Sequence, residues 1–251
     1  TFFIVGLPGL FVAALMYYTV REPARKGVEQ DLAEIPLKNV LSYLLQRKQA
    51  YLGHILGISI FIMVVYALNL WGPTYFIRTF EYSRPEAGWV FGLVMISAGT
   101  FGLLTAGLLS DKLMARGIHD AYIRMILFSM LAIMPCAIAL GFIENDKLAI
   151  VAMAFAIYFS AFQGGISGGA LQLMTPNRMR GQVTALFLLA ANLIGLGLGP
   201  TVIAMVTDYI FMDEAAIGKS IALCTLLLCP TGAFILWRSM PAIQKQLAEQ
   251  G

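Results

Sequence analysis

The sequence has few charged residues, because only 12% of its 251 residues are Asp, Glu, Lys or Arg while 59% are hydrophobic. A soluble domain carries about a quarter charged residues, which it needs to cover its surface in water. The low share therefore excludes an ordinary water-soluble domain, and most of the surface must face lipid or other protein. The net charge of +3 is also too small to indicate a nucleic-acid partner.

Residues that carry catalysis or bind metals are scarce as well. There are two histidines and three cysteines, and the cysteines lie singly in apolar runs without metal-ligand or redox spacing. No pair of carboxylates stands in an apolar segment where it could act as acid and base. We therefore expect no catalytic residue, no metal site and no cofactor, and we predict that the protein is not an enzyme.

Long segments without charge dominate the chain. Each has at least 18 residues, about enough to cross a hydrocarbon core of roughly 30 Å as a helix. Backbone groups in lipid must pair within their own segment, so the crossing segments are helices. The segments are 1–20, 49–77, 87–110, 125–143, 148–177, 181–207 and 220–237. We predict an all-α membrane protein, with a six-helix transmembrane bundle and one transmembrane helix before it.

Four parts follow from this pattern. Residues 1–20 are a transmembrane helix, 21–50 a charged cytoplasmic linker, 51–237 the six-helix bundle and 238–251 a cytoplasmic tail. Since the chain starts inside an apolar run without a start methionine, we expect a preceding part of a longer protein.

The linker also contains an apolar pattern of helical period. Pro36 suits the first turn of a helix, and we expect this amphipathic helix to lie on the cytoplasmic membrane surface. The residues that share its apolar face are Leu37, Val40, Leu41, Leu44 and Leu45.

Basic residues predict the orientation of the bundle. If the chain after the first segment is cytoplasmic, the cytoplasmic parts hold 13 of the 17 Lys and Arg residues. The outer loops then hold only Arg78, Arg84, Lys147 and Lys219. Cytoplasmic loops of membrane proteins carry such an excess. We predict a multi-pass plasma-membrane protein, in the inner membrane if bacterial, with the linker and carboxyl terminus cytoplasmic.

Glycines recur within the apolar segments at spacings that allow helix backbones to approach closely. They include Gly88, Gly92, Gly99 and Gly107, the pair Gly164 and Gly168, and the pair Gly195 and Gly199. This pattern indicates a packed bundle and no particular activity.

The loop after segment 87–110 carries a recognisable motif. Gly107, Asp111 and Lys112 match the pattern G-x-x-x-D-[RK]-x-G-[RK]-[RK], which resembles the cytoplasmic loop signature of the major facilitator superfamily. Met114 stands where a glycine is usual, and Arg116 replaces a basic pair. A degenerate form of this kind is typical of the second copy of the motif, in the carboxyl-terminal half of the family's members.

Three further stretches extend the resemblance over nearly the whole chain. The runs 175–182 and 191–200 resemble the loop and helix eleven of the superfamily. Together with Trp71-Gly72-Pro73, the second run is most similar to the spinster-like branch. The resemblance implies that segment 1–20 is helix six, that the linker joins two halves, and that helices seven to twelve follow. The substrate site would lie near the membrane midplane, between these helices and the missing amino-terminal half.

The loop charges form a candidate latch on the cytoplasmic side. A carboxylate at a helix end can accept bonds from a guanidinium or from a facing helix amino terminus. We expect this latch cluster to close the cytoplasmic side in outward-facing states, although a solvated charge pair of little energetic value is the alternative. The latch cluster is Asp111, Lys112, Arg116 and Arg180.

Polar residues inside the apolar segments are the candidate substrate site, because burial without a partner is costly. Ser160, Gln163 and Ser167 share one predicted helical face, and Tyr66, Asn69 and Asn192 lie in other segments. We predict that these six residues line a water-accessible cavity facing the missing half. The alternative is hydrogen bonding between helices within the bundle.

Coupling groups are missing from the segments. No acidic residue lies deep in the six complete segments, and Asp208 is expected at the outer boundary. His54 is interpreted as an interfacial histidine and not as a proton carrier. Because ion coupling needs an ionisable group in the membrane, groups that couple transport to protons are expected in the missing half.

The resemblance implies a secondary active transporter working by alternating access. In the spinster-like branch its partner would be a small amphiphilic substrate drawn from membrane lipids, of the lysophospholipid or sphingoid-phosphate type. A sugar acid, organic anion or drug is the alternative cargo. A seven-helix membrane receptor also fits seven crossings, but the last segment lacks a mid-depth lysine and the long linker fits it poorly.

Overall fold

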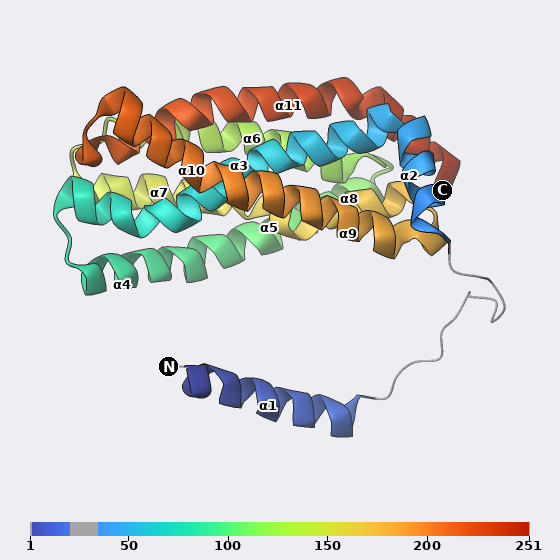
Figure 1. The fold of residues 1–251 in the computed structure, drawn as a ribbon, viewed down its shortest axis with the longest axis horizontal. Helices are drawn as coiled ribbons and strands as arrows, with labels where there is room; N and C mark the ends of the chain where they lie inside the picture. The colour runs from blue at the N-terminus through green and yellow to red at the C-terminus, as the bar shows by residue number, and fades with distance from the viewer. Residues whose placement is uncertain (1, 21–34, 251) are drawn as a thin grey trace. The chain divides into compact units, whose positions relative to one another are not determined.

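The computed structural model describes residues 2–20 and 35–250, and the described part is helical without a strand (Figure 1). The chain divides into two units, Thr1–Glu34 and Ile35–Gly251. In the first unit, α1 (Phe2–Thr19) is an apolar helix with Pro8 inside it. Residues 21–34 of the predicted linker lie outside the described residues.

The second unit contains six helices that are long and apolar enough to cross a membrane, which confirms the predicted bundle. Two of these spans are single helices, α3 (Lys48–Phe80) and α6 (Ala121–Ala139). The span after α3 consists of α4 (Arg84–Val94), the π-helical η1 (Met95–Gly99) and α5 (Thr100–Ala115).

The other three spans are also built from several elements. The fourth is α7 (Asp146–Ser160) with α8 (Phe162–Met174). The fifth consists of η2 (Asn177–Met179), α9 (Arg180–Ala190), η3 (Ala191–Leu196), α10 (Gly197–Met205) and η4 (Val206–Phe211). The last is η5 (Glu214–Ala216) with α11 (Ile217–Gln250). Helix α11 thus continues through residues 238–250, which the sequence predicts as a tail.

Helix α3 lies at the centre of the bundle. In an 18-residue apolar stretch of α3, 67% of the residues are buried. Glycines allow its backbone to approach α11, because a Cβ added at Gly57 would lie 3.0 Å from the carbonyl oxygen of Gly232. On its other side, a Cβ at Gly199 of α10 would lie 2.4 Å from the Met63 carbonyl oxygen. Figure 1 shows α11 and α3 running along the length of this unit, with the shorter α10 beside α3.

Two spans have a much smaller buried share than α3. Only 17% of the apolar stretch of α4–η1–α5 and 28% of that of the span η2–η4 are buried within the chain. Their exposed faces carry large apolar side chains such as Leu104, Leu108, Leu189 and Leu193. These spans therefore present broad apolar faces to lipid or to another protein.

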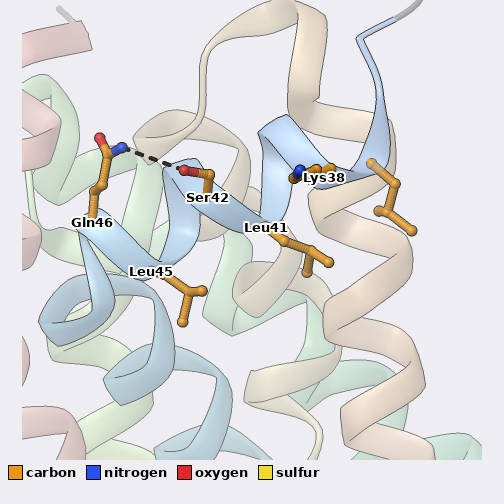
Figure 2. A pocket seen from close by; sticks show the side chains of 6 residues that line it. Lys38, Leu41, Ser42, Leu45 and Gln46 are labelled. Carbon is orange, nitrogen blue, oxygen red and sulfur yellow. Dashed lines mark hydrogen bonds between the residues drawn. The ribbon is translucent and has the colours of Figure 1, made fainter.

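The predicted amphipathic helix is α2 (Leu37–Gln46), which begins directly after Pro36. Its apolar face is divided, because Val40 and Leu44 are buried against the bundle while Leu37, Leu41 and Leu45 are exposed. Part of the predicted apolar face thus packs on the bundle, and the position of α2 on the cytoplasmic membrane surface stays a prediction. Figure 2 labels Leu41 and Leu45 together with Lys38, and it shows the hydrogen bond that Gln46 Nε2 donates to Ser42 Oγ at 3.4 Å.

Hydrogen bonds fix α2 to two spans. Gln182 Nε2 of α9 donates to the Ile35 carbonyl oxygen at 2.9 Å, and Tyr43 donates to Gln246 Oε1 of α11 at 3.4 Å. The guanidinium of Arg47 lies 4.1 Å from the centre of the Tyr43 ring. We call this end of the bundle the linker end, and it comprises residues 35–50, 110–124, 174–182 and 238–250.

Candidate functional site

Two of the predicted cavity residues meet between α3 and η3. Tyr66 donates to Asn192 Oδ1 at 3.2 Å, and Asn192 Nδ2 donates to the Leu188 carbonyl oxygen at 2.8 Å. Tyr66 is half-buried, whereas Asn192 is exposed within the chain. Asn192 lies in a π-helical segment, and such wide turns are frequent at functional sites. The structure thus joins Tyr66 of α3 to Asn192 of the span η2–η4 in a hydrogen-bonded polar pair, of which Asn192 is exposed.

Asn69 lies one helical turn after Tyr66 on α3. Its Oδ1 atom is buried and has no hydrogen-bond partner among the described residues. Leaving a buried acceptor unpaired costs about 1–3 kcal/mol. The neighbouring Trp71 does have a partner, because its Nε1 donates to the Pro200 carbonyl oxygen at 3.0 Å. Asn69 Oδ1 is therefore the buried acceptor in this region that still lacks a hydrogen-bond donor.

The predicted polar face of residues 160–167 crosses the junction of two helices, and its members differ in exposure. A turn at Ala161 separates α7 from α8. Ser160 is buried and donates to the Ile157 carbonyl oxygen at 2.8 Å, and Ser167 is buried as well. Gln163 is half-buried, and its side chain has no hydrogen-bond partner in the described ranges 2–20 and 35–250. Gln163 thus remains available to a ligand, whereas the two serines lie inside the bundle.

His54 lies inside the bundle as well, and its place near the membrane interface stays a prediction. Its side chain is fully buried, and Nε2 lies 3.2 Å from the Ser167 carbonyl oxygen. The Phe187 ring lies 5.8 Å away, between ring centres. Nδ1 has no partner within the described part of the chain. The apolar neighbours of His54 in the sequence gave no signal of the backbone carbonyl that Ser167 presents to it.

The latch cluster lies at the linker end, but its members do not pair with one another. Asp111 is exposed and accepts a hydrogen bond from Tyr122 at 3.0 Å. Arg180 donates through Nε to the Thr175 carbonyl oxygen at 3.1 Å. Lys112 and Arg116 are exposed, and neither forms an ion pair with any described residue. The cluster therefore offers free charge to groups outside the described chain.

A polar group that the sequence did not predict lies beside this cluster. Asp120 is buried just before α6 and accepts from Arg124 Nε at 2.7 Å and from Gln244 Nε2 at 2.8 Å. Burial raises the pKa of the Asp120 carboxyl, but the bonds from Arg124 and Gln244 outweigh it and hold the pKa below its ordinary value. The i, i+4 spacing of Asp120 and Arg124 was the only signal in the sequence.

Comparison with known proteins gives a consistent family match. The family model described as Major Facilitator Superfamily matches residues 1–200. An "MFS-type efflux pump" of Mycolicibacterium smegmatis is 26% identical over 258 residues, which cover 99% of this chain and 58% of the relative. The chain therefore spans little more than half the length of this curated relative.

Solved structures also match this chain over little more than half of their own length. The chain is similar to a bacterial homolog of the human lysosomal transporter Spinster in an inward-facing and unoccupied conformation, with a TM-score of 0.60 and 19% identity. That match covers 99% of this chain and 59% of the solved one. The inward-facing and occupied form gives a TM-score of 0.53 at 18% identity. The six-span unit thus has the fold of one half of such a transporter. Since the family model covers most of the sequence, the chain belongs to the major facilitator superfamily.

Proposed function

We propose that this chain forms the carboxyl-terminal half of a secondary active transporter that works by alternating access. The observation that carries the proposal is the hydrogen bond between the half-buried Tyr66 of α3 and the exposed Asn192 of η3, within two largely apolar spans. Exposing such a pair to lipid is costly, and polar groups within spans normally face a bundle interior or a water-filled cavity. The face around Asn192 therefore belongs opposite the amino-terminal half, where transporters of this architecture bind substrate.

The site favours an amphiphilic lipid as substrate, of the lysophospholipid or sphingoid-phosphate type. Tyr66, Asn69, Gln163 and Asn192 are uncharged hydrogen-bonding groups set among apolar side chains. Such a half-site suits a long apolar chain with hydroxyl or amide groups near its head. The structural likeness to a Spinster homolog supports a spinster-like branch for this chain.

A second candidate is the export of a drug or another organic anion, with a sugar acid in the same group. The relative from Mycolicibacterium smegmatis, described as an efflux pump, favours it. Both candidates are transport functions, and the family match favours them over a seven-helix receptor or an enzyme. The charge of an anionic cargo would then be bound by the other half.

The basic residues support a cytoplasmic position for the linker end in the plasma membrane. Lys38, Arg47, Lys48, Lys112 and Arg116 all lie at this end. Proton coupling would use groups of the amino-terminal half, because the described mid-span residues of the six spans include no carboxylate. Asp208 lies in η4, in the last turn of its span.

Flux through the full-length protein in liposomes tests the proposal. Lysophospholipid flux is measured with and without a proton gradient and is compared with the flux of a sugar acid. Asn69→Ala and Gln163→Ala should each reduce lipid flux about tenfold, the effect of losing one substrate hydrogen bond worth roughly 1.4 kcal/mol. Thr231→Ala is the matched control, because Thr231 donates to the Leu227 carbonyl oxygen of its own helix at 2.7 Å.

The outcomes separate the alternatives. Unchanged flux in both variants, with normal yield of folded protein, would remove Asn69 and Gln163 from the substrate site. Sugar-acid flux without lipid flux would favour the second candidate. Lipid flux that is equal with and without the proton gradient would exclude proton coupling.

A further inference from the structure

A cavity of about 820 Å³ opens at the linker end, away from Tyr66 and Asn192. The turn 117–120, the first turns of α6 and α9, and the last turns of α11 contribute to its wall. Gly117 has a φ of +87°, which lets the turn after α5 reverse direction tightly before α6 begins. The cavity therefore depends on a defined turn and three helix ends.

Two guanidinium groups line this cavity, those of Arg124 and Arg180. Each uses Nε for a hydrogen bond within the protein, to Asp120 and to the Thr175 carbonyl oxygen respectively. The terminal NH₂ groups of both have no hydrogen-bond partner among the described residues. The Arg124 side chain is 54% exposed, so a ligand can reach it.

Asp120 holds one of these guanidiniums in place. It is the only carboxylate among the described residues that line the cavity. It accepts bonds from Arg124 and from Gln244, and its side chain is only 7% exposed. Its charge is thus engaged with Arg124, while Arg180 adds a second positive charge. The cavity lining therefore carries a net positive charge. Asp120 fixes the orientation of the Arg124 guanidinium through its hydrogen bond.

The rest of the lining is partly apolar. Leu173 of α8, Leu247 of α11 and Met114 of α5 form this part of the wall. Arginine forks bind phosphate oxygens in a bidentate manner. Basic pockets between transmembrane helices at the membrane surface bind phosphate-bearing headgroups. We propose that this cavity is a second binding site, which takes a phosphate group through Arg124 and Arg180.

Two sources can supply that phosphate, a phospholipid headgroup and free inorganic phosphate. The apolar wall would add contacts for the glycerol backbone or first methylenes of a lipid, which free phosphate lacks. The site is separate from the proposed substrate face, and its occupancy is measured by binding and not by transport. Failure of one proposal is therefore distinguishable from failure of the other.

Binding to the purified full-length protein in phosphatidylcholine nanodiscs provides the test. Short-chain phosphatidic acid and inorganic phosphate are titrated separately by calorimetry. We expect saturable binding that weakens about tenfold or more in Arg124→Gln and in Arg180→Gln, since each variant removes a charge-assisted bond. Lys245→Gln is the matched control, because Lys245 is an exposed cation on α11 that does not line this cavity.

Arg124→Lys keeps the charge but loses the fork, so it should bind with intermediate affinity. It also serves as the second variant should Arg124→Gln unfold once Asp120 loses its partner. Tighter binding of phosphatidic acid than of phosphate would assign the site to a headgroup, and equal binding would assign it to free phosphate. Absence of saturable binding, or an equal loss in Lys245→Gln, would overturn the proposal.

Discussion

Replacing Gly199 by alanine tests the packing of α10 against α3. The new Cβ would lie 2.4 Å from the Met63 carbonyl oxygen and 2.8 Å from Met63 Cα. The first distance is about 1 Å below the 3.4 Å at which ordinary van der Waals contact begins. Both obstructing atoms belong to the backbone of α3 and cannot rotate away, so the two helices must separate.

The cost can be worked out from these distances. Overpacking of this kind costs about 1–3 kcal/mol, and alanine recovers roughly 0.5–1 kcal/mol of that through its better helix propensity. A net loss of about 0.5–2 kcal/mol corresponds to a fall in Tm of roughly 1–8 °C for a domain of this size. We expect this fall in Gly199→Ala.

Thermal unfolding of the full-length protein in detergent, followed by intrinsic fluorescence, measures the loss. Gly181→Ala in α9 is the matched control, because a Cβ at Gly181 has no atom within 4 Å. Its Tm should rise by about 1–4 °C, since an open position gains only the helix propensity of roughly 0.5–1 kcal/mol. An equal Tm for Gly199→Ala and Gly181→Ala would refute the close approach of α10 to α3.

Two further predictions concern the linker end. Asp111→Asn should shift the protein toward inward-facing states, because the amide loses the charge by which Asp111 would hold the cytoplasmic side closed. Faster labelling of single cysteines placed on the cytoplasmic side measures this shift, and unaltered labelling would count against the latch. The second prediction is that Asp120 stabilises the protein at neutral pH and loses this effect in acid. Its folded pKa is below the ordinary value of 3.8, so the contribution is complete above pH 3.8 and disappears as pH falls through the folded pKa. The Tm advantage over Asp120→Asn should be constant from pH 7 to 5 and shrink below pH 4, and an advantage that persists there would contradict the assignment.

The bundle could be predicted from the sequence because one physical rule governs it. An uncharged segment that crosses lipid must form its backbone hydrogen bonds within itself, and it therefore becomes a helix. The rule says nothing of where a helix changes pitch. The turn at Ala161 and the π-helical segment Ala191–Leu196 both lie in uncharged, largely apolar stretches. These features depend on packing between spans, and so hydropathy could not reveal them.

The candidate site was predictable only in part. Tyr66 and Asn192 were chosen as separate polar residues, and the structure joins them by a hydrogen bond. Ser160 and Ser167 are both buried, whereas Gln163 of the same predicted face is half-buried, and the periodicity could not distinguish them. Asp120 was missed because Gln244 is 124 positions away, in a segment that the sequence predicts as a tail. Contacts between such distant residues require the helices to be placed first.

Glycines with the same spacing turn out to have different surroundings, and the difference bears on the missing half. Gly195 and Gly199 lie against Ile62 and Met63 of α3, so close packing explains their lack of a side chain. A second group of glycines lies in open surroundings, since a Cβ added at any of them would have no atom of the described residues within 4 Å. This group is Gly88, Gly92, Gly107 and Gly168. Glycine within a helix costs about 0.5–1 kcal/mol relative to alanine unless a close approach requires it. Nothing among the residues that the structure describes makes that approach, and lipid tails would tolerate a methyl group equally well. The open glycines of α4, α5 and α8 are therefore the positions where we expect helices of a second bundle to come closest.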